Sequence, residues 1–340
     1  MTRNDAPPAV LRYRERGWWT GVPALSAVRP GRMLRASDVV APAREVAVLT
    51  PEQHDRSAAV LLGLAAGDAL ASGDDFAWSE RTAAAVDLAL LMADGRDPRE
   101  ADLWEELGAN AEPGASGPGA DDPEAVRLAA GRRLLRTAPV ALALLDDPVA
   151  LAEAARLVGS GRGTAVTGLD RTDADPDADP GTGDAAVLFG LSLRVAVLEG
   201  RLDPRAGLAT LPAEARAAWE AHLAAAGQGR TVDVQRVGAV GGVLQGAWAI
   251  LGEAGAADAS LVEQVISRAA HSGADPASVA AAGALLAGRW GLEAVPVAWR
   301  RRVHGRPDLF GIDLVRLGML STRSGVPHDP DDPARMDVLR

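Results

Sequence analysis

Apolar residues recur at helical spacing along most of the chain, in stretches that start at capping residues and often end at glycine. In the stretch that follows Thr50, "PEQHDRSAAVLLGLAAGDALA", Thr50 can serve as the N-cap, Pro51 takes the first helical position and Glu52 lies in the first turn. The same criteria predict further helices over residues 80–94, 98–107, 123–136, 148–158, 184–199, 212–225, 235–252, 259–270, 276–289, 296–302 and 311–323. Several of them end at a glycine, namely Gly95, Gly159, Gly200 and Gly291.

Stretches with the alternating pattern of β-strands are almost absent, so the hydrophobic pattern predicts an all-α fold. Composition supports this prediction. Apolar residues make up 48% of the chain but aromatic residues only 4%, and Ala, Leu and Val supply most of the apolar mass, which favours close-packed helices over sheets. A chain of 340 residues is also long enough to bury a large core.

The pattern divides the chain into three parts. Residues 1–55 hold six prolines and the Trp18–Trp19 pair and show little helical period, which predicts an irregular N-terminal extension. The tryptophan pair either anchors this segment to the core or contacts a partner or ligand. The helical domain is expected over residues 56–325, followed by a C-terminal tail over 326–340.

Two interior stretches are predicted to be loops. Residues 110–123 are rich in glycine and proline, and residues 159–184 are acidic and of low complexity. The alternating aspartates over 173–179 resemble a calcium-binding loop. However, Pro180 stands where such a loop needs glycine and no glutamate follows at the right offset, so a solvated acidic loop is favoured.

Charge and cysteine usage exclude several classes of function. The formal net charge is −11 and every lysine-or-arginine position is arginine, without a basic tract, so nucleic acid and anionic membranes are poor partners. The absence of cysteine excludes disulfides, thiolate zinc sites and cysteine nucleophiles. The N-terminus lacks the apolar core of a signal peptide and no segment looks like a membrane span, so we expect a cytoplasmic protein.

Polar residues gather at the ends of three helices that are rich in small residues. The stretch "LLGLAAGDALASGDDF" (61–76) ends in Asp74 and Asp75, and "WSERT" (78–82) opens the next helix. Far along the chain, "HSGADPASVAAAGALLAGRWG" (271–291) places an aspartate directly before a first-turn proline. The small residues let these helices pack close to their neighbours.

In order and spacing, these stretches resemble the ADP-ribosylglycohydrolase family, the family of the dinitrogenase-reductase-activating glycohydrolases. The resemblance covers roughly residues 56–325 and includes "LLRTAPVALALLDDPVALAEAA" (134–155), "VGGVLQGAWAIL" (240–251) and "AVPVAWRRRVHGRPDL" (294–309). It implies a compact, multi-helix orthogonal bundle. In that family, carboxylates and hydroxyls at the corresponding openings hold a pair of magnesium ions, which bind the ribose hydroxyls and help to activate water.

The family's ligand residues are only partly present in the first two openings. The family pattern G-D-A-L-G-x-P-x-E is matched by residues 67–70, and Asp75 stands where the family has its glutamate. In the pattern [ST]-D-D-T, Ser79, Glu80 and Thr82 match, but Arg81 replaces the second aspartate. The four-residue step from Asp75 to Ser79 is also shorter than the family's loop, which predicts a more open or reshaped pocket.

The late opening departs further from the family pattern G-G-D-T-D-T. Gly273 and Asp275 match and Ser278 stands for the last threonine, but Pro276 and Ala277 replace the first threonine and the second aspartate. The family's Thr-His-x-Asp-Pro segment corresponds to "PDADP" (176–180), so its histidine is absent.

These departures predict a weakened metal site. Magnesium needs near-octahedral oxygen coordination, whereas Arg81 adds a fixed positive charge and no ligand oxygen. We therefore expect no metal or one weakly bound magnesium, whose ligands would be Asp75, Ser79, Glu80, Asp275 and Ser278. Alternatively, Arg81 faces Asp75 and Asp275 and neutralises them in place of a metal, by charge-assisted hydrogen bonds.

Each candidate residue also has a structural interpretation. Ser79 and Asp275 are good N-caps, worth about 1 kcal/mol each. Glu80 is favoured by the helix dipole alone. Asp75 fits a solvated turn equally well. The remaining two are assigned mainly structural roles: His271 as a packed or capping side chain, and Asp68 as a carboxylate buried among small residues and hydrogen-bonded to backbone.

Three functions follow from the resemblance. The favoured one is a catalytically lapsed member that binds ADP-ribose, another nucleotide or a protein partner, the last through residues 1–55; its ligand-binding residues would be Ser79, Arg81, Thr82, Gly273 and Ser278. The second is a divergent one-metal hydrolase of N- or O-glycosidic ADP-ribosyl bonds, with Asp75, Glu80 and Asp275 as catalytic residues. The third is another reaction on a ribosyl-like substrate.

Overall fold

The computed structural model describes residues 48–73, 75–100, 103–104, 122–160, 181–228, 234–254 and 258–323. Several predictions concern segments outside these ranges: the extension with Trp18–Trp19, the tail over 326–340, and most of the loops over 110–123 and 159–184 with their aspartates. The limits of the extension and of the tail therefore stay predictions.

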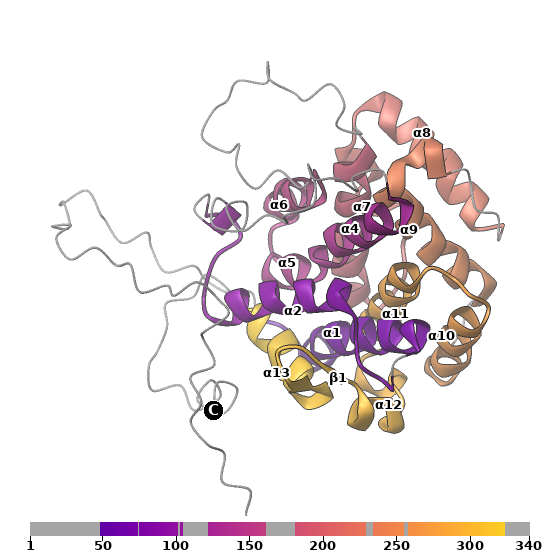
Figure 1. Ribbon diagram of the computed structural model, residues 1–340. Helices are drawn as coiled ribbons and strands as arrows, with labels where there is room; N and C mark the ends of the chain where they lie inside the picture. The colour runs from indigo at the N-terminus through magenta and orange to yellow at the C-terminus, as the bar shows by residue number, and fades with distance from the viewer. Residues whose placement is uncertain are drawn as a thin grey trace, which may run out of the picture. The chain divides into compact units, whose positions relative to one another are not determined.

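The described part of the chain is built almost entirely from helices, as predicted (Figure 1). The α-helices are α1 (Pro51–Ser72), α2 (Glu80–Ala93), α4 (Pro123–Leu135), α5 (Thr137–Ala143), α6 (Pro148–Ser160), α7 (Gly181–Glu199), α8 (Ala213–Ala226), α9 (Val234–Ala254), α10 (Val262–His271), α11 (Pro276–Trp290), α12 (Val297–Arg302) and α13 (Gly311–Ser321). Short 3-10 turns lie at η2 (Leu208–Thr210), η3 (Ala259–Leu261) and η4 (Leu292–Ala294), and two-residue strands at β1 (His304–Gly305) and β2 (Leu309–Phe310). The part of the chain that the structure describes contains no helix long and apolar enough to cross a membrane.

Most predicted helix ends are confirmed. The Thr50 hydroxyl accepts a hydrogen bond from the Gln53 amide at 3.3 Å, and Gln53 Oε1 accepts one from the Thr50 amide at 2.9 Å, so α1 begins in a capping box. Gly200 and Gly291 follow α7 and α11 with φ angles of 66° and 78°, which glycine adopts readily. The predicted end at Gly159 is wrong, because α6 continues to Ser160.

Two other predictions need correction. The predicted helix over 98–107 does not begin at its expected start, because residues 98 and 99 lie in a turn and residue 100 is not helical. Helix α5 was not predicted, since Pro139 interrupts its sequence. Pro139 is the third residue of α5, where the missing amide proton would have no partner within the helix, so it does not break the helix.

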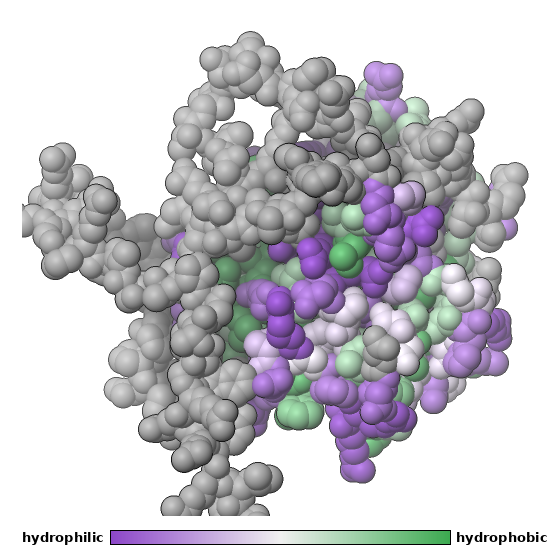
Figure 2. All heavy atoms as spheres, viewed as in Figure 1, coloured by the Kyte–Doolittle hydropathy of each residue, from purple (hydrophilic) through white to green (hydrophobic). Residues whose placement is uncertain are grey.

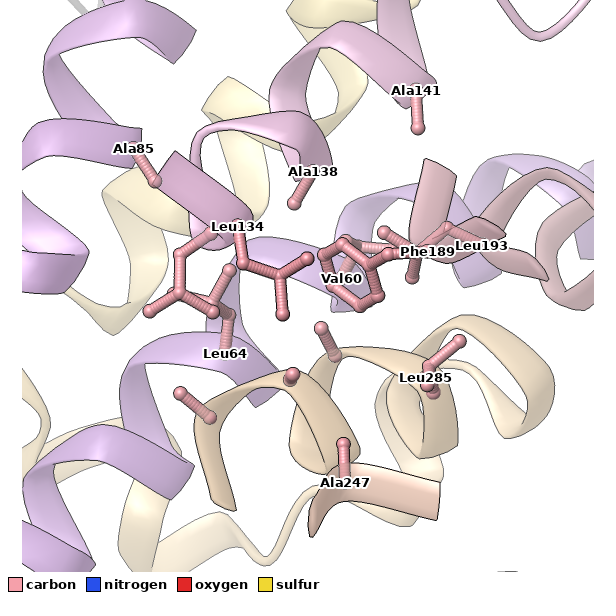
Figure 3. Close-up of a cluster of buried hydrophobic side chains, with 14 of the residues drawn as sticks. Val60, Leu64, Ala85, Leu134, Ala138, Ala141, Phe189, Leu193, Ala247 and Leu285 are labelled. Carbon is pink, nitrogen blue, oxygen red and sulfur yellow. The ribbon is translucent and has the colours of Figure 1, made fainter. Parts of the chain in front are cut away.

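The core is organised around the contact between α1 and α11, which lie side by side in the middle of the bundle (Figure 1). Gly63 faces Gly283 so closely that a Cβ on Gly63 would lie 2.5 Å from the Gly283 carbonyl oxygen. Larger buried side chains then fill the space between this helix pair and α7, as Val60, Phe189 and Leu285 show (Figure 3). The small residues read from the sequence therefore allow backbone-to-backbone packing of the two helices whose ends carry candidate site residues.

The strands link residues 76–78, in the connection between α1 and α2, to the residues that precede α13. The pair β1–β2 is antiparallel, with His304 opposite Phe310. His304 also bridges to the connection: its amide donates to Phe76 O at 3.1 Å and its carbonyl accepts from the Trp78 amide at 2.9 Å. This short hairpin, residues 304–310, was not predicted, and it fixes the chain that leads into α2.

Substitution of Gly63 by alanine tests the helix contact. Alanine has the higher helix propensity by about 1 kcal/mol, yet its Cβ would overlap the α11 backbone. We expect Gly63→Ala to lower the free energy of unfolding in urea by about 2 kcal/mol, within the range for overpacked cores. Gly183→Ala in α7 is the control, because its Cβ would meet no atom closer than 3.6 Å. Equal effects of the two substitutions would contradict the close approach.

Candidate functional site

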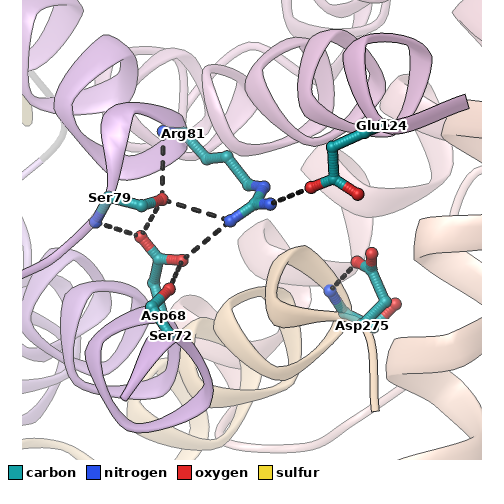
Figure 4. Close-up of polar contacts among 7 residues, drawn as sticks. Asp68, Ser72, Ser79, Arg81, Glu124 and Asp275 are labelled. Carbon is teal, nitrogen blue, oxygen red and sulfur yellow. Dashed lines mark hydrogen bonds and ion pairs between the residues drawn. The ribbon is translucent and has the colours of Figure 1, made fainter. Parts of the chain in front are cut away.

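The centre of the candidate site is a carboxylate that is completely buried. Asp68, on α1, is 0% exposed. Its Oδ2 accepts hydrogen bonds from the Ser79 amide at 2.8 Å and from the Ser79 hydroxyl at 2.7 Å, and its Oδ1 accepts one from Ser72 Oγ at 3.3 Å (Figure 4). The predicted structural role of Asp68, buried and bonded to backbone, is confirmed. This carboxylate holds the start of α2 against α1.

Ser79 and Arg81 complete this cluster. Ser79 is the N-cap of α2, as predicted, because its hydroxyl accepts from the Arg81 amide at 3.2 Å. The Arg81 guanidinium lies over the same group, with Nη1 3.8 Å from Asp68 Oδ1 and 3.4 Å from Ser79 Oγ (Figure 4). Its Nη2 lies 4.0 Å from the exposed carboxylate of Glu124, on α4. The side chain of Arg81 is only 11% exposed, so its charge is held inside the protein.

Arg81 and Ala277, the two residues that stand where the family has aspartates, pack against one glycine. A Cβ on Gly131, in α4, would lie 2.9 Å from Arg81 Cδ and 2.8 Å from Ala277 Cβ. Ala277 is completely buried. Gly131 therefore makes room for the arginine stem, and the family's second aspartate position on α11 is filled by a methyl group in a packed interior.

The late opening is used for capping and packing. Asp275 is the N-cap of α11, as predicted: its Oδ1 accepts from the Ser278 amide at 3.1 Å. The Ser278 hydroxyl is buried and donates to the carbonyl of Val243, on α9, at 2.9 Å. Gly273 lies in an exposed turn with a φ of 77°. His271 contacts the Ser267 carbonyl through Nδ1 at 2.6 Å, which agrees with the capping interpretation.

Thr82 lies in the first turn of α2 and is completely buried. Its hydroxyl is without a hydrogen-bond partner within the described part of the structure. Thr82 thus retains the position of the family's threonine but faces the protein interior.

The two remaining candidate carboxylates, Asp75 and Glu80, lie at the surface and face arginines. The side chain of Asp75 is 93% exposed, and its Oδ1 accepts a hydrogen bond from Arg302 at 3.2 Å. Arg302 also lies over the Phe76 ring, 4.1 Å from its centroid. Glu80 is 52% exposed and lies 3.4 Å from the guanidinium of Arg306. Arg302 precedes the hairpin over residues 304–310, and Arg306 lies within it.

The expected partners of Arg81 were wrong. Its ion pairs within the described residues join it to Asp68 and Glu124, and not to Asp75 or Asp275. The reason is local geometry. Asp75 has a φ of 37°, in a turn after α1 that exposes its side chain to Arg302, whereas Asp68 lies buried within the last turns of α1. Glu124 and Gly131 could not be found from the sequence, because only the packing of α4 on α2 brings them to Arg81.

This arrangement does not fit a magnesium pair. Within the described ranges, no group of three or more His, Asp or Glu side chains gathers where a metal could bind. Asp75 and Glu80 face guanidinium groups, and the Ser278 hydroxyl is bonded to backbone. The set predicted as metal ligands is therefore divided between ion pairs with arginines, two helix caps and a buried hydrogen bond: Asp75 and Glu80, Ser79 and Asp275, and Ser278, respectively.

Comparison with known proteins identifies the family of this chain. The ADP-ribosylglycohydrolase family model matches residues 49–324. The chain belongs to the ADP-ribosylglycohydrolase family. A solved structure described as an ADP-ribosylglycohydrolase-related protein complex is 23% identical, with 82% of this chain and 100% of that chain covered and a TM-score of 0.52, which supports the helical fold. No curated protein matches. The resemblance inferred from the sequence is thus confirmed.

A double-mutant cycle measures the buried ion pair. Arg81→Met removes the positive charge that faces the buried Asp68 carboxylate, and we expect it to lower the free energy of unfolding by about 2 kcal/mol. This is less than the usual loss for a broken buried ion pair, because three hydrogen bonds to Asp68 remain. Combined with Asp68→Asn in urea denaturation, it should show coupling of about 1 kcal/mol. The matched cycle of Arg302→Met with Asp75→Asn, an exposed pair, should show no measurable coupling. Equal coupling in both cycles would refute the central role of Asp68.

Proposed function

We propose that this ADP-ribosylglycohydrolase family member is catalytically lapsed and acts by binding ADP-ribose or another nucleotide without cleaving it. The observation that carries the proposal is the guanidinium of Arg81. It replaces a family carboxylate and lies 3.8 Å from the buried Asp68, in the space between the openings of α2 and α4. A fixed cation there repels a divalent ion and supplies no oxygen ligand.

The surrounding residues support the same conclusion. A magnesium-dependent hydrolase needs carboxylates that are free to coordinate the ion and orient water. Here Asp75 and Glu80 each face a guanidinium, and Ala277 offers a methyl group where the family has a carboxylate. We derive no hydrolytic step from this arrangement.

Binding remains compatible with what the chain retains. Helices α2 and α11 still begin near the family's site position, and helix N-termini favour anions. Arg81, Arg132 and Arg306 add positive charge around the first turns of α2. An anionic ligand such as a nucleotide suits this environment better than a cation does.

The other functions have less support. A one-metal hydrolase would require Arg81 to leave Asp68, and the packing of its stem on Gly131 opposes that movement. Within the described residues, no further group of side chains supports a different reaction on a ribosyl-like substrate. A protein partner for residues 1–55 concerns a segment that lies almost wholly outside the described residues. A cytoplasmic location, and the exclusion of nucleic acid and membranes as partners, stay predictions.

Calorimetric titration with ADP-ribose tests the proposed function. We expect binding whose Kd is the same in magnesium and in EDTA, together with no release of ADP-ribose from ADP-ribosylated protein substrates. Magnesium-dependent binding or measurable hydrolysis would overturn the proposal and favour the one-metal enzyme.

The double variant Arg81→Asp with Ala277→Asp restores both family aspartates and tests whether the rest of the metal site is intact or remodelled. Recovery of magnesium binding would mean that only these two ligands are missing. We expect no recovery, because Asp75 and Glu80 face guanidiniums and residue 277 is packed against Gly131. The measurement is magnesium titration by calorimetry, with the thermal unfolding curve as a control for folding. Magnesium binding to the double variant near that of active family members would contradict a remodelled site.

A further inference from the structure

Two arginines from distant parts of the chain meet over a single carboxylate at the start of α2. Arg132, on α4, places Nη2 3.7 Å from Glu80 Oε2, and Arg306, in the hairpin, places Nη2 3.4 Å from the same oxygen. The Glu80 side chain is 52% exposed, so it can rotate into solvent. Hydrophilic, intermediate and hydrophobic side chains are mixed on this face of the described surface (Figure 2).

The backbones of both arginines are held by buried contacts. The Arg306 carbonyl accepts from Trp78 Nε1 at 3.2 Å, and Trp78 is 5% exposed. Arg132 directly follows Gly131, which is packed against Arg81 and Ala277. The guanidinium groups nevertheless reach the surface, with 22% and 60% of the Arg132 and Arg306 side chains exposed. The backbone positions of the two arginines are thus fixed, and an anion has to order only their side chains.

The contacts between Glu80 and this pair are long, so an anion with more oxygens can bond to the pair better. One carboxylate faces two guanidiniums, at distances longer than the roughly 2.8 Å of a charge-assisted hydrogen bond. Asp87 also lies 3.4 Å from Arg306. Burial raises the pKa of the Asp87 carboxyl, and the charges of Arg306 and Arg136 oppose this shift.

We propose that Arg132 and Arg306 form a binding site for a diphosphate group, and that Glu80 occupies this site until the ligand displaces it. A diphosphate carries several oxygens and more than one negative charge, so it can bind both guanidiniums bidentately, which a single carboxylate cannot do. The inference rests on the proposed function, because it assigns the diphosphate of a bound nucleotide to these two arginines.

The test is calorimetric titration of the full chain in EDTA with inorganic pyrophosphate, ADP-ribose and adenosine. Glu80→Gln removes the competing carboxylate and should lower the Kd for pyrophosphate and ADP-ribose about tenfold, whereas Arg306→Gln should raise both about tenfold. The Kd for adenosine, which has no phosphate, should change with neither substitution. The matched controls are Glu199→Gln and Arg201→Gln, an exposed ion pair at 2.7 Å beyond α7, which should leave every Kd unchanged.

A variant that fails to fold would bind pyrophosphate more weakly, so misfolding cannot produce the lower Kd expected for Glu80→Gln. The proposal is overturned if Glu80→Gln and Arg306→Gln change the pyrophosphate Kd no more than the controls do. Binding of ADP-ribose without these changes overturns the diphosphate site and leaves the lapsed-enzyme function intact. Hydrolysis of ADP-ribosylated protein by a chain that shows the expected Kd changes overturns the function and supports the site.

Discussion

The structure around the candidate site depends on one interaction, the burial of the Asp68 carboxylate beneath the start of α2. A charge that is fully removed from water costs several kcal/mol unless hydrogen bonds and an opposite charge compensate it. Ser79 supplies two hydrogen bonds and Arg81 supplies the charge. Because Ser79 is also the N-cap of α2, the compensation of one carboxylate fixes where and at what angle this helix begins. The Arg81 stem then determines how closely α4 can approach, through Gly131.

A cation that belongs to the chain differs physically from a bound metal ion. A guanidinium donates hydrogen bonds in a plane and cannot accept an oxygen ligand, polarise water or dissociate. The family's chemistry requires the opposite properties. On the proposed function, this chain therefore keeps the family's fold, has arginines at the site that can recognise an anionic ligand, and has lost the coordination that hydrolysis needs.

The hairpin over residues 304–310 connects the two ends of the helical domain. It pairs with residues 76–78 and holds Trp78 against Gly305, so the short connection from α1 to α2 is shaped by residues more than two hundred positions later in the chain. It also carries Arg306 to Glu80. The short connection is thus paired with the hairpin, and arginines in or beside the hairpin face Asp75 and Glu80.

The sequence by itself determined the features that depend on neighbouring residues. The N-cap at Thr50, the glycine ends, the caps at Ser79 and Asp275, and the family motifs follow from side chains a few positions apart, and local hydrogen bonds decide the caps. Only the tertiary structure decided the partners of Arg81 and Glu80, the strands of the hairpin, and the packing of Gly131. Those depend on which elements meet in space, since an ion pair between residues far apart in the chain has no period or spacing in the sequence to reveal it.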